Sequence, residues 1–148
     1  MLILCSELLN EIRAHAQECY PQEACGLLVG DVKASVRRTS LIRRARNLEV
    51  ERASDRYELD PQDYYAADEL ARASGLEVIG IYHSHPDHPA RPSRTDLERA
   101  WEGWSYLILS IENGALKAFH SFEKVRDAFL EEQVCSCTER VSRSEARR

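Results

Sequence analysis

The feature that most constrains this chain is a short apolar run that ends directly in a segment rich in histidine and proline. Residues 78–82 read Val-Ile-Gly-Ile-Tyr, and residues 83–93 continue as His-Ser-His-Pro-Asp-His-Pro-Ala-Arg-Pro-Ser. Such an apolar run is typical of a central strand that is covered on both faces. Three prolines without periodicity predict that residues 83–93 form a fixed loop. The fold therefore needs a buried strand with a stiff loop at its end.

Helical and strand-like patterns alternate on both sides of this run. Apolar residues recur at helical spacing over 6–19, with Ser6 as the predicted N-cap, and Asp60-Pro61 opens a second helix that ends at Gly75. A third, short helix is predicted at 95–101. We predict strands at 24–29 and 35–48, a hairpin of 105–111 with 115–122, and a strand or helix at 125–134. This order indicates an α/β domain with a mixed sheet.

Length and composition fit a single globular unit. The 148 residues are 43% hydrophobic and 30% charged. No apolar run approaches the roughly 18 residues of a membrane-spanning helix, and the apolar start is too short for a secretory leader. We therefore expect a cytoplasmic protein with no membrane partner. We assign residues 1–134 to the domain and residues 135–148 to a polar, frayed tail.

The charge balance argues against a nucleic-acid partner. The net charge is −5, from 20 basic and 25 acidic residues, so the basic footprint that nucleic acid requires is missing. One local basic cluster is interpreted as the solvated face of a strand; it consists of Arg37, Arg38, Arg43, Arg44 and Arg46.

The five cysteines, at positions 5, 19, 25, 135 and 137, form neither an even disulfide framework nor a Cys-x-x-Cys pair. We expect reduced thiols, most of them structural. A cysteine hydrolase built on Cys25 is an alternative, but Cys25 lies in an apolar run where inert burial is usual.

His83 and His85 point to a metal site. Two residues apart in extended backbone, they project from the same face and can share one cation. Asp96 lies eleven residues further on, at the start of the predicted short helix, where its carboxylate can supply a third ligand. Two histidines and one carboxylate leave the fourth position of tetrahedral zinc open, as in catalytic sites. The pattern therefore predicts one zinc ion in an open site.

Hydrolysis at such a site also needs a group that moves protons. Glu23 precedes the apolar strand 24–29 and is the candidate. On its own it also fits a simple turn residue. Ser93 has two interpretations: with Asp96 it has the form of a helix capping box, and its hydroxyl can alternatively donate to a developing oxyanion.

These residues together carry a resemblance to a known family. Glu23, His83-Ser-His-Pro86 and Pro92-Ser-Arg-Thr-Asp96 are similar to the JAMM (MPN-plus) motif of the Mov34/MPN/PAD-1 metallopeptidases, in particular the short stand-alone prokaryotic members. The similarity spans roughly residues 6–121. It implies a single-domain fold with a curved, mostly antiparallel sheet flanked by helices, similar in outline to cytidine deaminases.

The resemblance also implies roles for the residues. His83, His85 and Asp96 are expected to hold zinc, Glu23 to act as general acid and base, and Ser93 to stabilise the tetrahedral intermediate. The implied substrate is the C-terminal tail of a ubiquitin-like sulfur-carrier protein (ThiS/MoaD type), cut after its Gly-Gly, with release of cysteine or another extension. The chain is too short for the insertions with which larger eukaryotic relatives grip ubiquitin chains.

A zinc deaminase requires His-x-Glu and Pro-Cys-x-x-Cys, and neither is present. A general deconjugase of ubiquitin-like tags and a non-catalytic scaffold or binding module remain alternatives. His88, in the proline loop, is either a substrate contact or a solvated loop residue.

Overall fold

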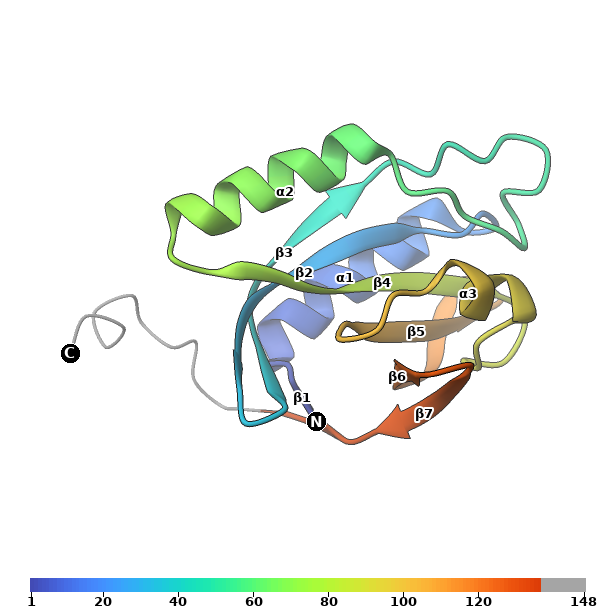
Figure 1. The fold of residues 1–148 in the computed structure, drawn as a ribbon. Helices are drawn as coiled ribbons and strands as arrows, with labels where there is room; N and C mark the ends of the chain where they lie inside the picture. Colours follow the sequence, from blue (N-terminus) through green and yellow to red (C-terminus); the bar gives the residue numbers. More distant parts are fainter. Residues whose placement is uncertain (137–148) are drawn as a thin grey trace.

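The structure is a computed structural model that describes residues 1–136. Its elements, in chain order, are β1 (Leu2–Ile3), α1 (Ser6–Cys19), β2 (Cys25–Lys33), β3 (Val36–Ala45), α2 (Pro61–Ala73), β4 (Glu77–Pro86), α3 (Arg94–Arg99), β5 (Ser105–Glu112), β6 (Ala115–Val125), β7 (Ala128–Glu132) and β8 (Val134–Cys135). The strands form one curved sheet, with α1 on one face and α2 on the other (Figure 1). The predicted α/β class is confirmed.

The strand order of the sheet is β7-β6-β5-β4-β2-β3-β1-β8. Antiparallel pairing joins β2 to β3 and β4, and β6 to β5 and β7, while β4 pairs with β5 in parallel and β1 pairs in parallel with β3 and β8. The two outermost strands, β7 and β8, are separated in the chain only by Gln133. The segment 128–135 therefore bridges both ends of the sheet and nearly closes it.

Helix boundaries follow local signals closely, with one exception. Asp60 caps α2 by accepting a hydrogen bond from the Gln62 amide, and Pro61 takes the first helical position, as predicted. At α1 the predicted cap is wrong: Cys5 is the N-cap, without a side-chain hydrogen bond, and Ser6 is already helical. The short helix α3 begins at Arg94, one residue earlier than predicted, behind Ser93.

The central strand is longer than the sequence suggested. We expected a loop from residue 83, but β4 continues through His83 and His85 to Pro86. The reason is that β4 has a partner on each side: Cys25 of β2 pairs with His83, and Ile108 of β5 pairs with the same residue. Pro86 lies at the last position of the strand, where a missing N–H is tolerated. Only residues 87–93 form the predicted loop.

The C-terminal elements are strands joined by tight turns. The β5–β6 hairpin turns at Asn113 and Gly114, both with positive φ (50° and 84°), as the Glu-Asn-Gly sequence predicts. The segment left open as a strand or a helix is the strand β7, which follows a turn at Arg126 (φ 58°). Of the predicted tail 135–148, Cys135 forms part of β8, and residues 137–148 lie outside the described part of the chain.

The core has one main cluster on each face of the sheet. On the α1 face, Leu8 and Ile12 pack against Ile79 and Tyr82, and on the α2 face Ala67 and Ala71 pack against strand residues such as Leu27. Of the helices in residues 1–136, none combines the length and the apolar character needed to cross a membrane.

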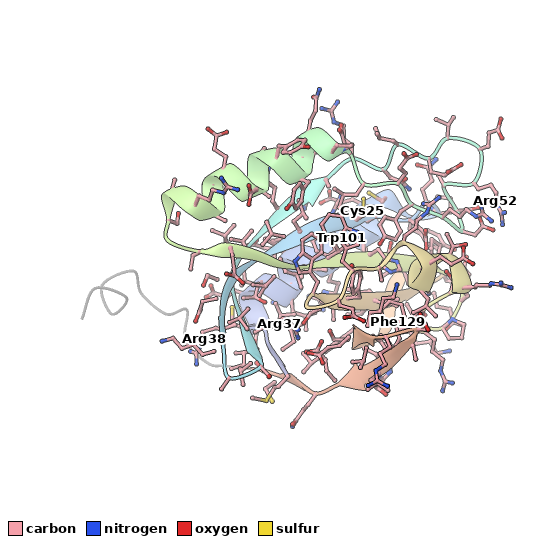
Figure 2. The ribbon with its side chains drawn as sticks, in the orientation of Figure 1. Cys25, Arg37, Arg38, Arg52, Trp101 and Phe129 are labelled. Atoms are coloured by element: carbon pink, nitrogen blue, oxygen red, sulfur yellow. The ribbon has the colours of Figure 1, made fainter. Side chains whose placement is uncertain are left out.

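The basic cluster on β3 is only partly solvated. Arg37 is buried rather than exposed, and its guanidinium contacts Glu123 and the Gly103 carbonyl and lies 3.8 Å from Glu132. Neighbouring Arg38 points the other way, since side chains alternate along a strand (Figure 2). The solvated-face interpretation was therefore wrong for Arg37. Among the described cysteines, residues 5, 19, 25 and 135 are free thiols, and Cys137 lies outside the described residues.

Candidate metal centre

The C-terminal half of β4 carries two imidazoles into the protein interior. His83 and His85 are 0% and 2% exposed. They project from the same side of the strand, because side chains two apart in a strand share a face, and their ring centroids lie 5.0 Å apart. This is the face that α2 covers. The extended backbone needed for a shared cation is present at both positions.

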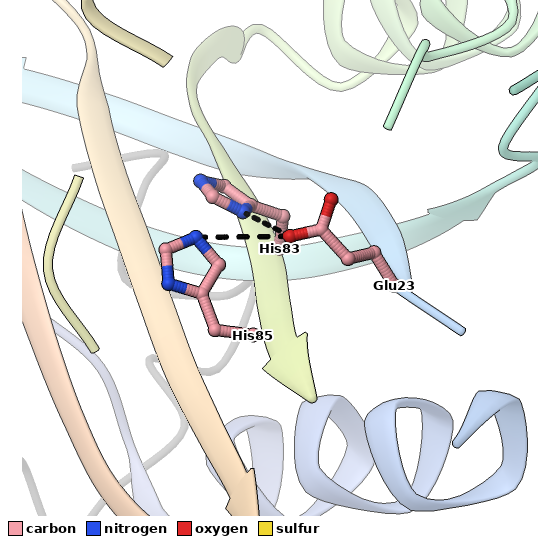
Figure 3. Close-up of side chains that lie close together, drawn as sticks. All are labelled: Glu23, His83 and His85. Carbon is pink, nitrogen blue, oxygen red and sulfur yellow. Dashed lines mark ion pairs between the residues drawn. The ribbon is translucent and has the colours of Figure 1, made fainter. Parts of the chain in front are cut away.

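Glu23 reaches the same point from the neighbouring chain segment. It lies two residues before β2, where the Ala24 amide donates to the Ser84 hydroxyl (2.8 Å) and the Ser84 amide donates to the Ala24 carbonyl (3.0 Å). Glu23 Oε1 then lies 3.7 Å from His85 Nε2 and 4.0 Å from His83 Nδ1 (Figure 3). Ser84, between the two histidines, thus fastens the Glu23 segment to the strand that carries them.

Asp96 approaches from α3. Its Oδ2 lies 3.4 Å from His85 Nε2 and 3.8 Å from His83 Nε2. The same oxygen accepts the Ser93 amide (2.8 Å), while the Ser93 hydroxyl accepts the Asp96 amide (3.0 Å). The capping-box interpretation of Ser93 is therefore confirmed. A hydroxyl that accepts one bond keeps its own proton to donate, so the cap does not prevent a second role.

The donor set suits a transition-metal ion. Glu23, His83 and His85 each offer a ligand atom, and these atoms lie within 4.8 Å of one another; Asp96 is outside this close group but within 4 Å of both imidazoles. Both ring nitrogens of His83 are buried without a hydrogen-bond partner among the described residues. Buried polar atoms are normally paired, so this imidazole fits a ligand better than a structural residue. Imidazole and carboxylate ligands suit zinc.

His85 is held in the tautomer that a metal requires. Its Nδ1 lies 2.8 Å from the Pro89 carbonyl oxygen, which can only accept, so Nδ1 carries the proton. The lone pair of the neutral ring is then on Nε2, the atom that faces Asp96 and Glu23. This arrangement is usual for metal-binding histidines.

The site shifts the pKa of its groups in opposite directions. Burial raises the pKa of Glu23 to about 8, with further contributions from Asp96 and Asp55. Burial lowers the pKa of His83 to about 3, against the opposing pull of Asp96. At Asp96 burial acts to raise the pKa, but the histidines and the Ser93 amide outweigh it and the net pKa is below its usual range. The His83 imidazole is thus neutral, as a metal ligand must be.

Three neighbouring residues complete the surroundings of the site, and only His88 among them was singled out from the sequence. The Tyr57 ring stacks on His83 with centroids 4.5 Å apart, and its pKa is raised by burial. His88, left open between contact and solvent, stacks on His85 at 4.2 Å. Asn47 binds the carbonyl of Glu23 (3.2 Å). A tyrosine and an asparagine in a charged stretch carry no local signal, because only the tertiary fold brings them to the histidines.

An aromatic groove adjoins the site on the same face of the sheet. Its volume is about 570 Å³, and Tyr57 forms a wall that the groove and His83 share. Tyr65 and Trp101 are 68% and 61% exposed, and Figure 2 shows Trp101 between α2 and α3. The aromatic lining consists of Tyr57, Tyr64, Tyr65, Trp101, Trp104 and Tyr106.

Comparison with known proteins yields consistent matches. Residues 6–123 match the family described as prokaryotic homologs of the JAB domain. The chain is 38% identical over 114 residues to a desampylase of Haloferax volcanii, covering 74% of this chain and 80% of the relative. It is 31% identical over 138 residues to the CysO-cysteine peptidase of Mycobacterium tuberculosis, covering 90% of each. The solution structure of a Desulfitobacterium hafniense protein is similar, with a TM-score of 0.84, 33% identity and 94% coverage of each chain.

Proposed function

The chain belongs to the family of prokaryotic homologues of the JAB domain, and on that premise we propose that it is a zinc-dependent peptidase acting on a ubiquitin-like protein. The proposed reaction is hydrolysis of the bond after the C-terminal Gly-Gly of a sulfur-carrier (ThiS/MoaD-type) protein, with release of cysteine or another extension. The observation that carries the proposal is His83, a fully buried imidazole whose two nitrogens have no partner among the described residues and face two carboxylates.

In this proposal His83, His85 and Asp96 hold one zinc ion. When bound, zinc lowers the pKa of a coordinated water to about 7 and polarises a carbonyl group. The protein's part is to present two imidazoles and an ionised carboxylate. Burial keeps His83 neutral, the Pro89 carbonyl fixes the tautomer of His85, and the capping box fixes the rotamer of Asp96.

Glu23 is the proposed proton carrier. Glu23 is 3% exposed, and its Oε1 lies within 4.0 Å of a nitrogen of each imidazole. In that position it can take a proton from the attacking water and return it to the leaving amine. The raised pKa of this carboxyl favours proton exchange near neutral pH.

Ser93 is the proposed oxyanion donor. Its hydroxyl accepts the Asp96 amide, and the remaining O–H can donate to the carbonyl oxygen of the bond being cleaved. Because that oxygen gains charge only as the reaction proceeds, the interaction lowers the barrier more than it strengthens binding. Ser93→Ala should therefore reduce kcat more than it raises KM.

The aromatic groove supports an extended apolar peptide as substrate. β4 already has β2 and β5 as neighbours, so a tail cannot add beside that strand and must lie across the face of the sheet. Tyr57 lines this groove and stacks on His83, so the proposed path of the tail runs along the groove to this ring. Glycines at the end of a tail suit this path, because they let a backbone approach a metal closely. The names of the relatives, a desampylase and a CysO-cysteine peptidase, support a ubiquitin-like substrate.

Mass spectrometry of carrier proteins tests the proposal. Zinc-loaded protein is incubated with a carrier that bears one extra C-terminal residue, with a longer extension, and with a lysine conjugate linked through Gly-Gly. We expect the extensions to be removed after Gly-Gly, and Glu23→Gln protein to leave them intact.

A second function, general removal of ubiquitin-like tags, is favoured by the similarity to a desampylase over 80% of that relative. The same experiment separates the two functions. Cleavage of the lysine conjugate alone would replace carrier processing by deconjugation. Cleavage of neither substrate by zinc-loaded protein would favour a non-catalytic binding module.

A further inference from the structure

The segment 48–58, called the strap here, links β3 to α2 and lies over the metal centre. It carries Tyr57, whose ring stacks on His83 at 4.5 Å. It also carries Ala53, which is buried and whose carbonyl accepts the Glu23 amide at 2.6 Å. The strap thus contacts both a proposed zinc ligand and the proposed proton carrier.

One side chain ties the strap to the site. Asn47 Oδ1 accepts the amides of Glu49 (3.0 Å) and Glu58 (2.9 Å), near the two ends of the strap. Asn47 Nδ2 donates to the carbonyls of Glu23 (3.2 Å) and Arg56 (3.1 Å). A side-chain amide has two donors and two acceptor sites, and all four are used here.

Glu23 depends on these contacts because it lies outside the regular strand. The β2 ladder begins at Cys25, so the ladder binds neither backbone polar group of Glu23. Its amide is bound by the strap through Ala53, and its carbonyl is bound by Asn47. Ser84 holds the next residue, Ala24, but the hydrogen bonds of Glu23's own amide and carbonyl come from the strap and from the residue that anchors it.

We propose that Asn47 is a positioning residue. Its Nδ2 group, called the donor arm, sets the position of the Glu23 carboxylate, and its Oδ1 atom, called the acceptor arm, sets the position of Tyr57. The proposal rests on the proposed function for Glu23. A displacement of about 1 Å in a reacting group can cost as much as 100-fold in rate, so a residue that touches no substrate can still control kcat. The acceptor arm acts on the groove wall, and therefore on KM.

Two variants separate the arms. Asn47→Asp keeps an oxygen for the amides of Glu49 and Glu58 but cannot donate to the carbonyls of Glu23 and Arg56. Asn47→Ala removes both arms without adding a charge. The matched control is Asn10→Asp, the same chemical change on an exposed position of α1. Each protein is assayed for zinc content, for kcat and KM on the extended carrier, and for amide hydrogen exchange.

We expect wild-type zinc content in all three variants, because Asn47 contacts none of the three proposed ligands. Both Asn47 variants should lose about 10- to 100-fold in kcat. The amides of Glu49 and Glu58 should exchange as slowly as in the wild type in Asn47→Asp and faster in Asn47→Ala. KM should rise more in Asn47→Ala, because Asn47→Asp keeps both acceptor bonds to the strap and loses only the bond to the Arg56 carbonyl beside Tyr57. Full kcat in Asn47→Asp would overturn the proposal, since Asn47 would then only fix the strap.

A double-mutant cycle tests whether the effect passes through Glu23. In the Glu23→Gln background, Asn47→Ala should lower kcat less than about 2-fold, because the group it positions no longer carries a proton. Losses that multiply would overturn the proposal.

Failure of the proposed function is a separate outcome, seen as no cleavage by the wild type. In that case the rate of hydrogen exchange at the Glu23 backbone amide tests the positioning role of Asn47 without any substrate. Faster exchange of this amide in zinc-loaded Asn47→Ala supports positioning by Asn47, and unchanged exchange overturns it.

Discussion

Two buried histidines, one on each face of the sheet, have opposite environments. His15 of α1 shares a 2.7 Å hydrogen bond with the hydroxyl of Tyr82 in β4. His83 follows Tyr82 in β4 and points to the other face of the sheet, and neither of its ring nitrogens has a hydrogen-bond partner among the described residues. Burial lowers the pKa of both, to about 4 for His15 and about 3 for His83. A lowered pKa therefore does not distinguish a structural histidine from a proposed ligand, whereas the hydrogen bonding differs between the two.

The surroundings of each ring explain the difference. On the α1 face Tyr82 and His15 satisfy each other within an apolar cluster, and the Tyr82 ring fits only because position 26 is glycine: a Cβ there would lie 2.2 Å from the ring. On the α2 face His83 meets two carboxylates and a tyrosine ring. The hydrogen bonds of His15 are satisfied by protein atoms alone, whereas the nitrogens of His83 stay without a partner among the described residues, as the proposed cation site requires.

The largest expected effect comes from removing the imidazoles of the site. The double variant His83→Ala, His85→Ala should retain no zinc after dialysis and show no detectable hydrolysis, whereas His15→Gln should keep zinc at the wild-type ratio. Metal analysis of the purified proteins measures this. Zinc at the wild-type ratio in the double variant would show that the ligands have been wrongly assigned.

The next effect separates zinc binding from proton transfer within the site. Glu23→Gln keeps the shape of the side chain but loses its titratable proton, so zinc content should stay normal while turnover falls about 100-fold or more. Single-turnover kinetics on the extended carrier measures the loss. Near-normal turnover would move the proton transfer to another group.

A pH effect tests the structural histidine. In the folded protein burial, followed by the charge of Arg44, lowers the pKa of His15 from 6.5 to about 4, while Glu18 acts in the opposite direction. Between pH 6.5 and pH 4, His15 is therefore protonated in the unfolded chain but not in the folded chain. The free energy of unfolding should thus fall by roughly 3 kcal/mol between pH 6.5 and pH 4.

Urea denaturation across this pH range measures the effect. The His83→Ala, His85→Ala protein is the suitable background, because it removes the titration of the site histidines. Adding His15→Gln should make the free energy of unfolding nearly independent of pH between pH 6.5 and pH 4. An equal slope with and without His15 would assign the pH dependence to other groups.

The smallest effect comes from the partner of His15. Tyr82→Phe keeps the ring but removes the hydroxyl, so His15 Nδ1 loses its partner and the free energy of unfolding should fall by about 1–2 kcal/mol. Tyr65→Phe, at an exposed ring, is the control and should change stability little. Zinc content should be unchanged in both proteins. Loss of zinc in Tyr82→Phe would mean that the two faces are coupled through β4.

How far the sequence predicts this molecule depends on how local each signal is. The His-x-His spacing predicts a shared face because strand alternation involves only neighbouring residues, and the Ser93–Asp96 capping box lies within one turn of helix. The prolines predict a loop from residue 83, but β4 extends to Pro86. The pairing with β2 and β5 that extends the strand cannot be deduced from the neighbouring sequence. Asn47 and Tyr57 were missed for the same reason: their contacts with the site, to Glu23 and to His83, join segments that are distant in the chain.

The bridging of the sheet by the segment 128–135 has a consequence for the order in which the protein assembles during synthesis. Leu2 of β1 pairs with Val134 of β8, so β1 can form hydrogen bonds on both of its sides only after β8 has been synthesised. Glu23, His83, His85 and Asp96 all leave the ribosome earlier. A nascent chain thus holds the whole metal centre while the sheet is still open at β1 and β6. Such unpaired strand edges favour misplaced pairing, and the segment 128–135 covers both of them, with β7 on β6 and β8 on β1.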